Sequence, residues 1–431
     1  MNDKLLRTLR LCVDVRPQEL SALLWSFAYF FSLLCGYFVL RPLRDEMGIA
    51  GGTNALPWLF TGTFVAMLCV VPVFGWVVKN FRRSKFVPWI YLFFVANILF
   101  FWGLFQLDIE KVYVARAFFI WTSVYNLFVV SVFWSFMSDI FHNEQSKRLY
   151  GFIAAGGTAG TIVGPALTIA LAVEIGTANL LLVSASFLAF AAFAVTRLAR
   201  TEVATQDSPR EAGPDAIGGG ILAGVVEAAK SPYLLGICLF MLLYTTTATV
   251  LYFQQAEIVR ASFSDSAERT RVFAAMDLAV STLTILCQVL ATGRLVKTFG
   301  VAIALMVLPL ITVAGFASLA MAPALALLIG FQVIRRSADY AINGPAREVL
   351  YTVIPREQKY KSKNFIDTAV FRGGDAISGW LYSGLAVGLS LDIAIIAWLC
   401  VPVAFMWMAV AWWLGRTQDK LANNDMAAQT P

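Results

Sequence analysis

Residues 301–321 read VAIALMVLPLITVAGFASLAM, a stretch without a single charged side chain. A helix needs about twenty apolar residues to cross the hydrocarbon core of a bilayer, which is roughly 30 Å thick. Comparable stretches recur along the whole chain, in which 59% of the 431 residues are hydrophobic and 14% are charged. A water-soluble domain does not bury that much apolar surface, so the composition predicts a protein of membrane-spanning helices.

Twelve stretches of this kind are expected to span the membrane. They cover residues 19–40, 56–78, 86–107, 112–137, 151–173, 178–196, 232–257, 273–295, 301–321, 322–342, 367–388 and 392–414. A charged leader precedes the first stretch without a small-residue cleavage pattern, so we interpret this stretch as a retained membrane helix rather than a signal peptide.

Lysine and arginine gather at both termini and in alternate loops, for example at residues 79–85, 147–148, 294–297 and 356–363. Because basic loops stay on the cytoplasmic side, this alternation predicts a cytoplasmic (inner) membrane protein with both termini in the cytoplasm. The same asymmetry explains the net charge of +6, so we expect no nucleic-acid partner.

The sequence lacks the usual patterns of metal, cofactor or ATP chemistry. Its six cysteines show no C-x-x-C spacing, and His142 is its only histidine. The glycines at Gly156, Gly160 and Gly164 lack the lysine of a phosphate-binding loop. We therefore expect no metal site, no cofactor, no ATP-driven pump and no enzymatic activity. The spacing of four instead predicts a smooth helix face on which a neighbouring helix packs closely.

The longest polar stretch divides the chain into two halves. Residues 201–215 are rich in Pro, Ser, Asp and Glu, which is typical of a linker, and residues 217–230 are expected to form a short surface helix. The predicted organisation is a six-helix bundle at 1–200, a cytoplasmic linker at 201–230 and a second six-helix bundle at 231–431.

The two halves also match each other when the chain is shifted by 213 residues. Glu144-Gln145 then falls on Glu357-Gln358, and Phe152-Ile153 falls on Phe365-Ile366. This match predicts two six-helix halves in parallel repeat, as in major facilitator transporters. The expected fold class is an all-α membrane protein of twelve transmembrane helices in a 6+6 arrangement.

Charged side chains lie inside or at the ends of two segments that otherwise resemble membrane spans. They are Arg335, Arg336, Arg347 and Arg372, with Asp339, Glu348, Asp367 and Asp375. An ionisable group near the bilayer centre costs roughly 3 kcal/mol on insertion scales, so it usually has a polar partner, a watery cavity or a ligand. Arg335 and Arg336 correspond to the neutral Thr122 and Ser123 in the repeat, so we interpret the charges as a specialisation of the second half.

Two interpretations remain open for several of these residues. Arg335 and Asp339 are four residues apart on one helix face, so they could form a partly neutralised pair instead of a ligand site. Arg347 follows Gly344-Pro345, which is either a break beside a binding site or an ordinary helix end.

The end of the first span carries a second group of charges, Arg41, Arg44 and Asp45, around Pro42. A helix from residue 19 already covers roughly 33 Å at Arg41, so these charges are expected at the outer mouth. They form either a solvated rim or a pair of guanidinium groups that meet an entering anion.

Residues 40–48, 345–348 and 359–375, together with Tyr351, resemble the nucleotide (ATP/ADP) transporter family. The resemblance implies a twelve-span relative of the major facilitator fold that exchanges nucleotides across bacterial or plastid membranes. It assigns Arg44-Asp45 and Arg347-Glu348 to the family's basic-acidic pairs. It also implies that Lys363 and Asp367 match the lysine and aspartate that open span eleven.

The predicted function is secondary transport of an anionic, phosphorylated, nucleotide-like solute by alternating access. The expected substrate-binding residues are Arg336, Arg335, Arg372, Arg347, Arg44 and Arg41. The expected gating or coupling residues are Asp339, Asp367, Asp375, Glu348, Asp45 and Asp277. Besides the small anionic substrate and the lipid bilayer we expect no partner, and the protein is expected to be a monomer.

Two other functions fit the same pattern. One is a proton-coupled permease or exporter of an organic anion, a siderophore or a peptide-like compound, with Asp277 or Asp375 as the proton carrier. The other is a membrane receptor or scaffold without transport. The aromatic residues Trp121, Tyr125, Trp134 and Tyr340 either stack on a base or pack within the protein.

Overall fold

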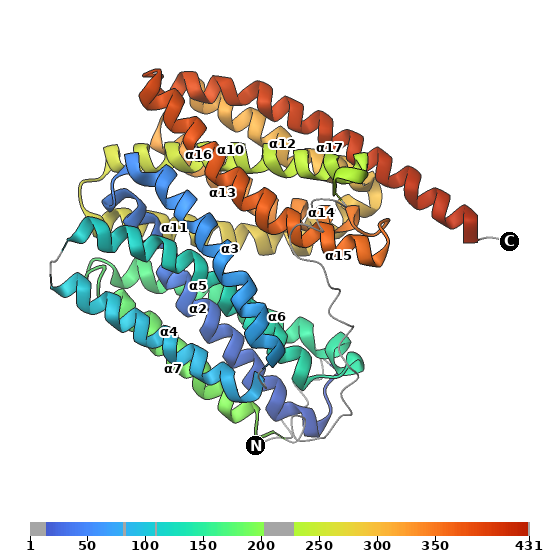
Figure 1. The fold of residues 1–431 in the computed structure, drawn as a ribbon. Helices are drawn as coiled ribbons and strands as arrows, with labels where there is room; N and C mark the ends of the chain where they lie inside the picture. The colour runs from blue at the N-terminus through green and yellow to red at the C-terminus, as the bar shows by residue number, and fades with distance from the viewer. Residues whose placement is uncertain (1–13, 81–82, 108–109, 202–227, 430–431) are drawn as a thin grey trace. The chain divides into compact units, whose positions relative to one another are not determined.

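The computed structural model describes residues 14–80, 83–107, 110–201 and 228–429, and the regular elements in these ranges are helices (Figure 1). Ten of the described helical stretches are long and apolar enough to cross a membrane. They coincide, in whole or in large part, with α2 (Leu20–Ala50), α3 (Leu56–Asn80), α4 (Arg83–Gln106), α5 (Lys111–Ile140), α6 (Asn143–Leu171), α7 (Leu180–Leu198), α10 (Pro232–Ser262), α11 (Ser266–Cys287), α12 (Gly293–Met321) and α17 (Ile393–Gln429).

Two further helical runs complete the twelve-helix fold, and they carry the charges singled out above. The first consists of α13 (Leu325–Ala338), the π-helical turn η4 (Asp339–Asn343) and α14 (Gly344–Leu350). The second consists of α15 (Arg356–Phe365), η5 (Ile366–Val370), α16 (Phe371–Ser383) and η6 (Gly384–Gly388). The predicted all-α membrane fold with twelve helical runs is confirmed.

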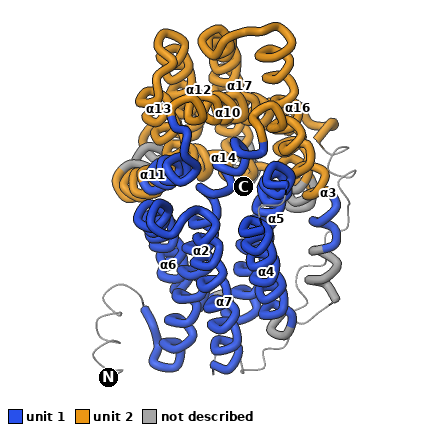
Figure 2. The backbone as a smooth tube through the Cα atoms, turned by 90° about the vertical axis from the view of Figure 1, so that its left-hand side faces the viewer, with its two compact units in different colours: residues 1–51, 69–211, 263–278 blue, residues 52–68, 212–262, 279–431 orange. Residues whose placement is uncertain are grey.

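The chain folds into two compact units, which Figure 2 shows in different colours. Unit 1 comprises Met1–Gly51, Cys69–Glu211 and Phe263–Leu278, and unit 2 comprises Gly52–Leu68, Ala212–Ser262 and Ala279–Pro431. Each unit is built mainly from one half of the sequence, but the start of α11 belongs to unit 1 and the start of α3 belongs to unit 2. The predicted linker with its surface helix falls largely on residues 202–227, outside the described residues.

Unit 1 is held together by close packing between α2 and α6. A Cβ atom on Gly156 would lie 2.6 Å from the Phe27 carbonyl oxygen, and one on Gly160 would lie 2.5 Å from the Phe31 carbonyl oxygen. Real Cβ atoms do not approach other atoms so closely, so only glycine fits at these positions. The smooth helix face expected from the glycine spacing is therefore present, and it faces α2.

The first span is longer than the sequence analysis predicts. Helix α2 continues through Pro42 to Ala50, although the expected end was Leu40. Proline has no backbone N–H and so leaves one carbonyl group of the helix without its hydrogen bond. Membrane helices tolerate such a proline, because neighbouring groups of the protein satisfy the freed carbonyl. As a result Asp45 and Glu46 are 8% and 0% exposed, so the interpretation as a solvated rim is wrong.

The tenth span is also longer than expected, because the helix does not stop at Gly344-Pro345. Pro345 has no N–H, and its ring would clash with the carbonyl four residues earlier in a regular α-helix. The wider π turn η4 avoids this clash, and the Gly344 N–H donates to the Asp339 carbonyl. The helix therefore continues to Leu350 instead of ending at residue 342.

Candidate functional site

Tyr244 of α10 is the centre of a polar cluster in unit 2. Its hydroxyl donates to Asp339 Oδ2 at 2.7 Å. Asn343 Nδ2 donates to the other carboxylate oxygen, Asp339 Oδ1, at 2.8 Å. The Arg335 guanidinium carbon lies 5.4 Å from the centroid of the Tyr244 ring. These four residues, Tyr244, Arg335, Asp339 and Asn343, are called the Tyr244 cluster below.

The π turn η4 explains why this cluster forms. It begins at Asp339 and ends at Asn343, so both of these side chains lie on the widened turn that Pro345 causes. Turns of this kind are rare and frequently lie at functional sites. The turn presents Asp339 to the Tyr244 hydroxyl and to the Asn343 amide, and among the described residues no ion pair joins Asp339 to Arg335. Of the two interpretations left open for Arg335 and Asp339, the partly neutralised ion pair is therefore not formed.

Arg335 is the least satisfied charge of the cluster. It is 4% exposed, and its Nε and Nη2 atoms are buried without a hydrogen-bond acceptor among the residues that the structure describes. Leaving a buried donor unsatisfied costs about 1–3 kcal/mol, and more for a charged group. The face of the Tyr244 ring stabilises this cation, and the Nε and Nη2 donors stay available to an anionic group.

Helix α16 brings two more predicted residues close to Tyr244. The Phe371 ring lies 5.9 Å from the Tyr244 ring, and the Arg372 guanidinium lies 5.0 Å from the Phe371 ring. Arg372 Nη1 lies 3.4 Å from Asp375 Oδ2, and Thr249 Oγ1 donates to Asp375 Oδ1 at 3.1 Å. Asp375 is therefore partly neutralised, while the side chain of Arg372 stays 34% exposed.

The remaining charges of this region lie on α14, α15 and η5. Lys363 Nζ donates to both carboxylate oxygens of Glu348, at 2.6 and 2.8 Å, so this pair ties α15 to α14. Arg347 is half-buried and its Nη1 lies 3.3 Å from Met241 Sδ. Asp367 is exposed on η5, and Arg336 is half-buried on α13.

Unit 1 contains a second group of ion pairs at the end of α2. Arg269 Nε and Nη2 donate to the two carboxylate oxygens of Glu46, each at 2.7 Å, in a bidentate pair. Arg41 Nε lies 3.7 Å from Asp277 Oδ2, and Arg44 Nη2 lies 3.0 Å from Asp45 Oδ1. Two of these pairs join α2, from the first half of the sequence, to α11, from the second half.

A comparison of the sequence with models of known protein families identifies the family of this chain. The family model described as Major Facilitator Superfamily matches residues 20–346, which is most of the chain. The chain belongs to the major facilitator superfamily. No curated protein is similar enough in sequence to supply a closer relative.

Solved structures of several transporters are similar to this chain in fold. The structure of a single-residue mutant of the nucleoside transporter NupG matches with a TM-score of 0.62 and 13% identity, covering 93% of this chain and 99% of that one. A bacterial homologue of the human lysosomal transporter Spinster, in an inward-facing and unoccupied conformation, matches with a TM-score of 0.63 and 15% identity, covering 95% and 99%. A bacterial homologue of the iron transporter ferroportin, in an inward-facing state, matches with a TM-score of 0.65 and 12% identity, covering 92% and 98%. At these identities the likeness concerns the fold alone.

Within this major facilitator protein, the predicted site residues divide between the units. Arg335, Arg336, Arg347, Arg372 and the four acidic residues predicted with them lie in unit 2. Arg41, Arg44, Asp45 and Asp277 lie in unit 1. Their roles in binding, gating or coupling stay predictions.

The sequence analysis missed several residues that the structure places at these sites. Tyr244 and Thr249 were overlooked, although residues 244–249 read YTTTAT inside an otherwise apolar span, and this run of hydroxyl groups was a usable signal. Glu46 and Arg269 were not paired, because they are far apart in the sequence. Trp121 stacks on Tyr125 with 5.2 Å between ring centroids, so these two rings pack within unit 1.

Proposed function

We propose that this major facilitator protein is a secondary active transporter for an anionic, phosphorylated solute, with nucleotides as the favoured class. It would act in the cytoplasmic membrane as a monomer, with both termini in the cytoplasm. The observation that carries the proposal is Arg335, a buried guanidinium on a membrane helix whose Nε and Nη2 atoms lack a hydrogen-bond acceptor among the described residues. Such a group is retained where a ligand or water supplies the missing partner.

The chemistry of the Tyr244 cluster suits a phosphate group. A guanidinium presents parallel N–H donors that match two phosphate oxygens, and such charge-assisted bonds are short and strong. The carboxylate of Asp339 does not compete for Arg335, since Tyr244 and Asn343 donate to it. The ring of Tyr244 stabilises the cation when no anion is bound.

Further arginines near the cluster would add affinity for a second phosphate group. Arg372 is connected to Tyr244 through Phe371, and its side chain is 34% exposed. Arg347 lies against Met241, one helical turn before Tyr244 on α10. A diphosphate or triphosphate has enough acceptor oxygens for several guanidinium groups, whereas an uncharged nucleoside has none of these phosphate oxygens. The resemblance to the nucleotide transporter family favours the same substrate class.

Alternating access requires contacts that break in each cycle, and we assign this role to the bidentate pair of Glu46 and Arg269. The pair ties the start of α11 to the end of α2. In the proposed cycle this pair opens when the binding site becomes accessible from outside. The pair of Lys363 and Glu348 has no such role, since it joins two neighbouring helices of the second half.

Transport by reconstituted protein tests this function. Proteoliposomes with the wild-type protein are expected to accumulate labelled nucleoside di- or triphosphate, and the Arg335→Met variant is expected to lose this uptake. Arg416→Met is the matched control, since Arg416 lies over the Trp412 ring outside the cluster. Equal uptake by wild type and Arg335→Met would disprove the anion site. Absence of uptake for every charged or neutral solute would favour a receptor or scaffold.

A proton-coupled permease is the second candidate, and one observation favours it. Asp277 is 1% exposed and its Oδ2 lies 3.7 Å from Arg41 Nε, and buried carboxylates on membrane helices are frequent members of proton relays in transporters. The same proteoliposomes distinguish the two candidates. Uptake that requires an inward proton gradient and is lost in Asp277→Asn would support coupling, whereas exchange against internal nucleotide without a gradient would exclude it.

A further inference from the structure

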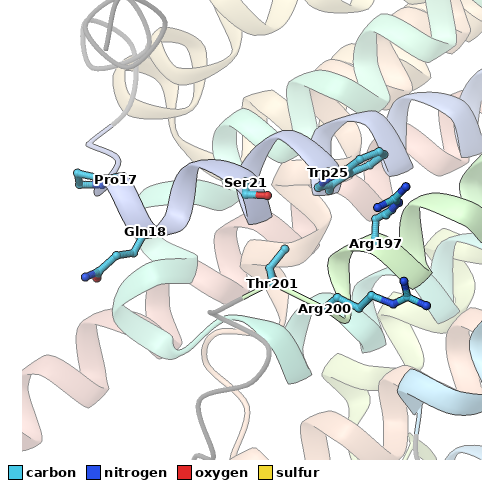
Figure 3. Close-up of a pocket in the computed structure, with 7 residues that line it drawn as sticks. All are labelled: Pro17, Gln18, Ser21, Trp25, Arg197, Arg200 and Thr201. Carbon is cyan, nitrogen blue, oxygen red and sulfur yellow. The ribbon is translucent and has the colours of Figure 1, made fainter. Parts of the chain in front are cut away.

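A polar pocket of about 410 Å³ lies in unit 1, between the start of α2 and the end of α7 (Figure 3). Gln18, Ser21 and Trp25 line it from the side of α2, and Arg197, Arg200 and Thr201 line it from the side of α7. None of the residues of the Tyr244 cluster lines this pocket. It lies at the membrane end that the basic loops predict to be cytoplasmic, so it faces the cytoplasmic leaflet in the proposed orientation.

The two arginines of the pocket carry charge that the described protein does not neutralise. Arg197 and Arg200 are exposed and three residues apart, and neither guanidinium donates a hydrogen bond to, or forms an ion pair with, a residue that the structure describes. Arg148, in the same unit, differs from them because its Nη2 donates to Glu19 Oε1 at 2.9 Å. The pocket therefore presents two guanidinium groups whose N–H donors are available to an external anion.

An aromatic surface continues from the pocket along α7 towards the membrane interior. Trp25 contacts Phe193 and Phe190, with ring centroids 5.8 and 6.5 Å apart, and the Arg197 guanidinium lies 5.0 Å from the Phe193 ring. Phe190 and Phe193 are 43% and 44% exposed. One end of this surface is thus cationic and polar, and the other end is apolar and accessible to acyl chains.

We propose that this pocket binds the headgroup of an anionic phospholipid of the surrounding leaflet. Arg197 and Arg200 bind the phosphate, Ser21 and Gln18 supply further polar contacts, and the acyl chains lie on Phe190 and Phe193. Basic pockets between membrane helices on the cytoplasmic side are suited to such headgroups. A soluble phosphate would use the two arginines alone, whereas a lipid uses both the charged and the aromatic part of the surface.

Native mass spectrometry of the full-length protein in detergent tests this site. Dioleoyl phosphatidylglycerol, dioleoyl phosphatidylcholine and inorganic phosphate are titrated separately against wild type. The double variant Arg197→Gln/Arg200→Gln is expected to bind phosphatidylglycerol about tenfold more weakly, since two charge-assisted contacts are lost. Ser21→Trp keeps both arginines but fills the pocket, so it should weaken binding as well.

Arg416→Gln/Lys420→Gln is the matched control, because it removes two positive charges from the end of another membrane helix and is expected to bind phosphatidylglycerol like wild type. A thermal unfolding curve without lipid checks that each variant is folded. An equal loss of phosphatidylglycerol affinity in the control and in the pocket variant would overturn the proposal, since lipid binding would then depend on the net charge of the protein alone. Equal binding of phosphatidylcholine, or binding of phosphate as tight as that of phosphatidylglycerol, would also overturn it.

Discussion

Replacing Arg269 by alanine leaves Glu46 as a buried charge without its partner, and the consequence can be estimated from the structure. Glu46 is 0% exposed and accepts two hydrogen bonds of 2.7 Å from Arg269. Removing one partner of a buried ion pair costs about 3–5 kcal/mol. Because 1.4 kcal/mol corresponds to a factor of ten, the state that contains this pair should lose at least about 100-fold in population relative to a state that exposes Glu46.

Cysteine accessibility measures this shift. Met47 is 7% exposed beside Glu46, so a single cysteine at Met47, on a background without the native cysteines, should react slowly with a membrane-impermeant thiol reagent. Adding Arg269→Ala should raise the reaction rate from outside by about 100-fold or more, because the rate follows the population of the open state.

Arg116→Ala is the control for this measurement. Arg116 Nε donates to the Gly51 carbonyl at 2.8 Å near the same end of α2, but its loss strands no buried charge. This variant should cost only about 1 kcal/mol and change the labelling rate little. A labelling rate in Arg269→Ala that equals the wild-type rate would refute the role of the Glu46 pair as a gate.

Three further predictions concern packing, the candidate site and topology. Gly160→Leu should lower the free energy of unfolding by about 1–3 kcal/mol, since a Cβ would already lie 2.5 Å from the Phe31 carbonyl oxygen. Gly151→Ala has open space at the Cβ position and should raise the free energy of unfolding by about 0.5–1 kcal/mol. Equal denaturation midpoints for the two variants would contradict the packing account. Tyr244→Phe removes the 2.7 Å hydrogen bond to Asp339 but keeps the ring under Arg335. The free energy of substrate binding, measured by calorimetry, should weaken by about 1.5–3 kcal/mol, and Tyr113→Phe is the control that should bind like wild type. Unchanged affinity in Tyr244→Phe would show that Asp339 is not part of the binding site. A cysteine at Asp265 should react with an impermeant reagent from outside and one at Glu144 should not, and the reverse pattern would invert the predicted orientation.

Much of the fold follows from local sequence patterns. The apolar stretches predict the spans because a helix satisfies its own backbone in lipid, and the glycine spacing predicts the face of α6 because a helix backbone approaches where side chains are absent. The charges near Arg335 and Arg372 single out two helical runs as candidates for the site, since charged side chains on such helices are rarely retained without a function. That choice stays a prediction.

The contacts that make the site are harder to predict, because they are not local. Tyr244 forms a hydrogen bond with Asp339, which lies 95 positions away in the sequence, and Glu46 forms an ion pair with Arg269, which lies 223 positions away. The π turn at Asp339 changes which side chains share a face, so the i, i+4 rule pairs Arg335 with Asp339 incorrectly. Two helix ends were also predicted wrongly because of proline. Helix α2 continues through Pro42, and the tenth span forms a wider π turn before Pro345 instead of ending there.

Thermal unfolding of the purified protein with a panel of ligands tests the central claim, the anion site at Arg335, most directly. Nucleoside diphosphate should stabilise the wild-type protein in a concentration-dependent way, by about 2.7 kcal/mol at 100 times the dissociation constant, and the effect should weaken with added salt. The uncharged nucleoside should give no shift, and Arg335→Met should lose the shift while Arg416→Met keeps it. A panel of phosphorylated compounds without any shift, together with a neutral or cationic solute that does stabilise the protein, would contradict the account.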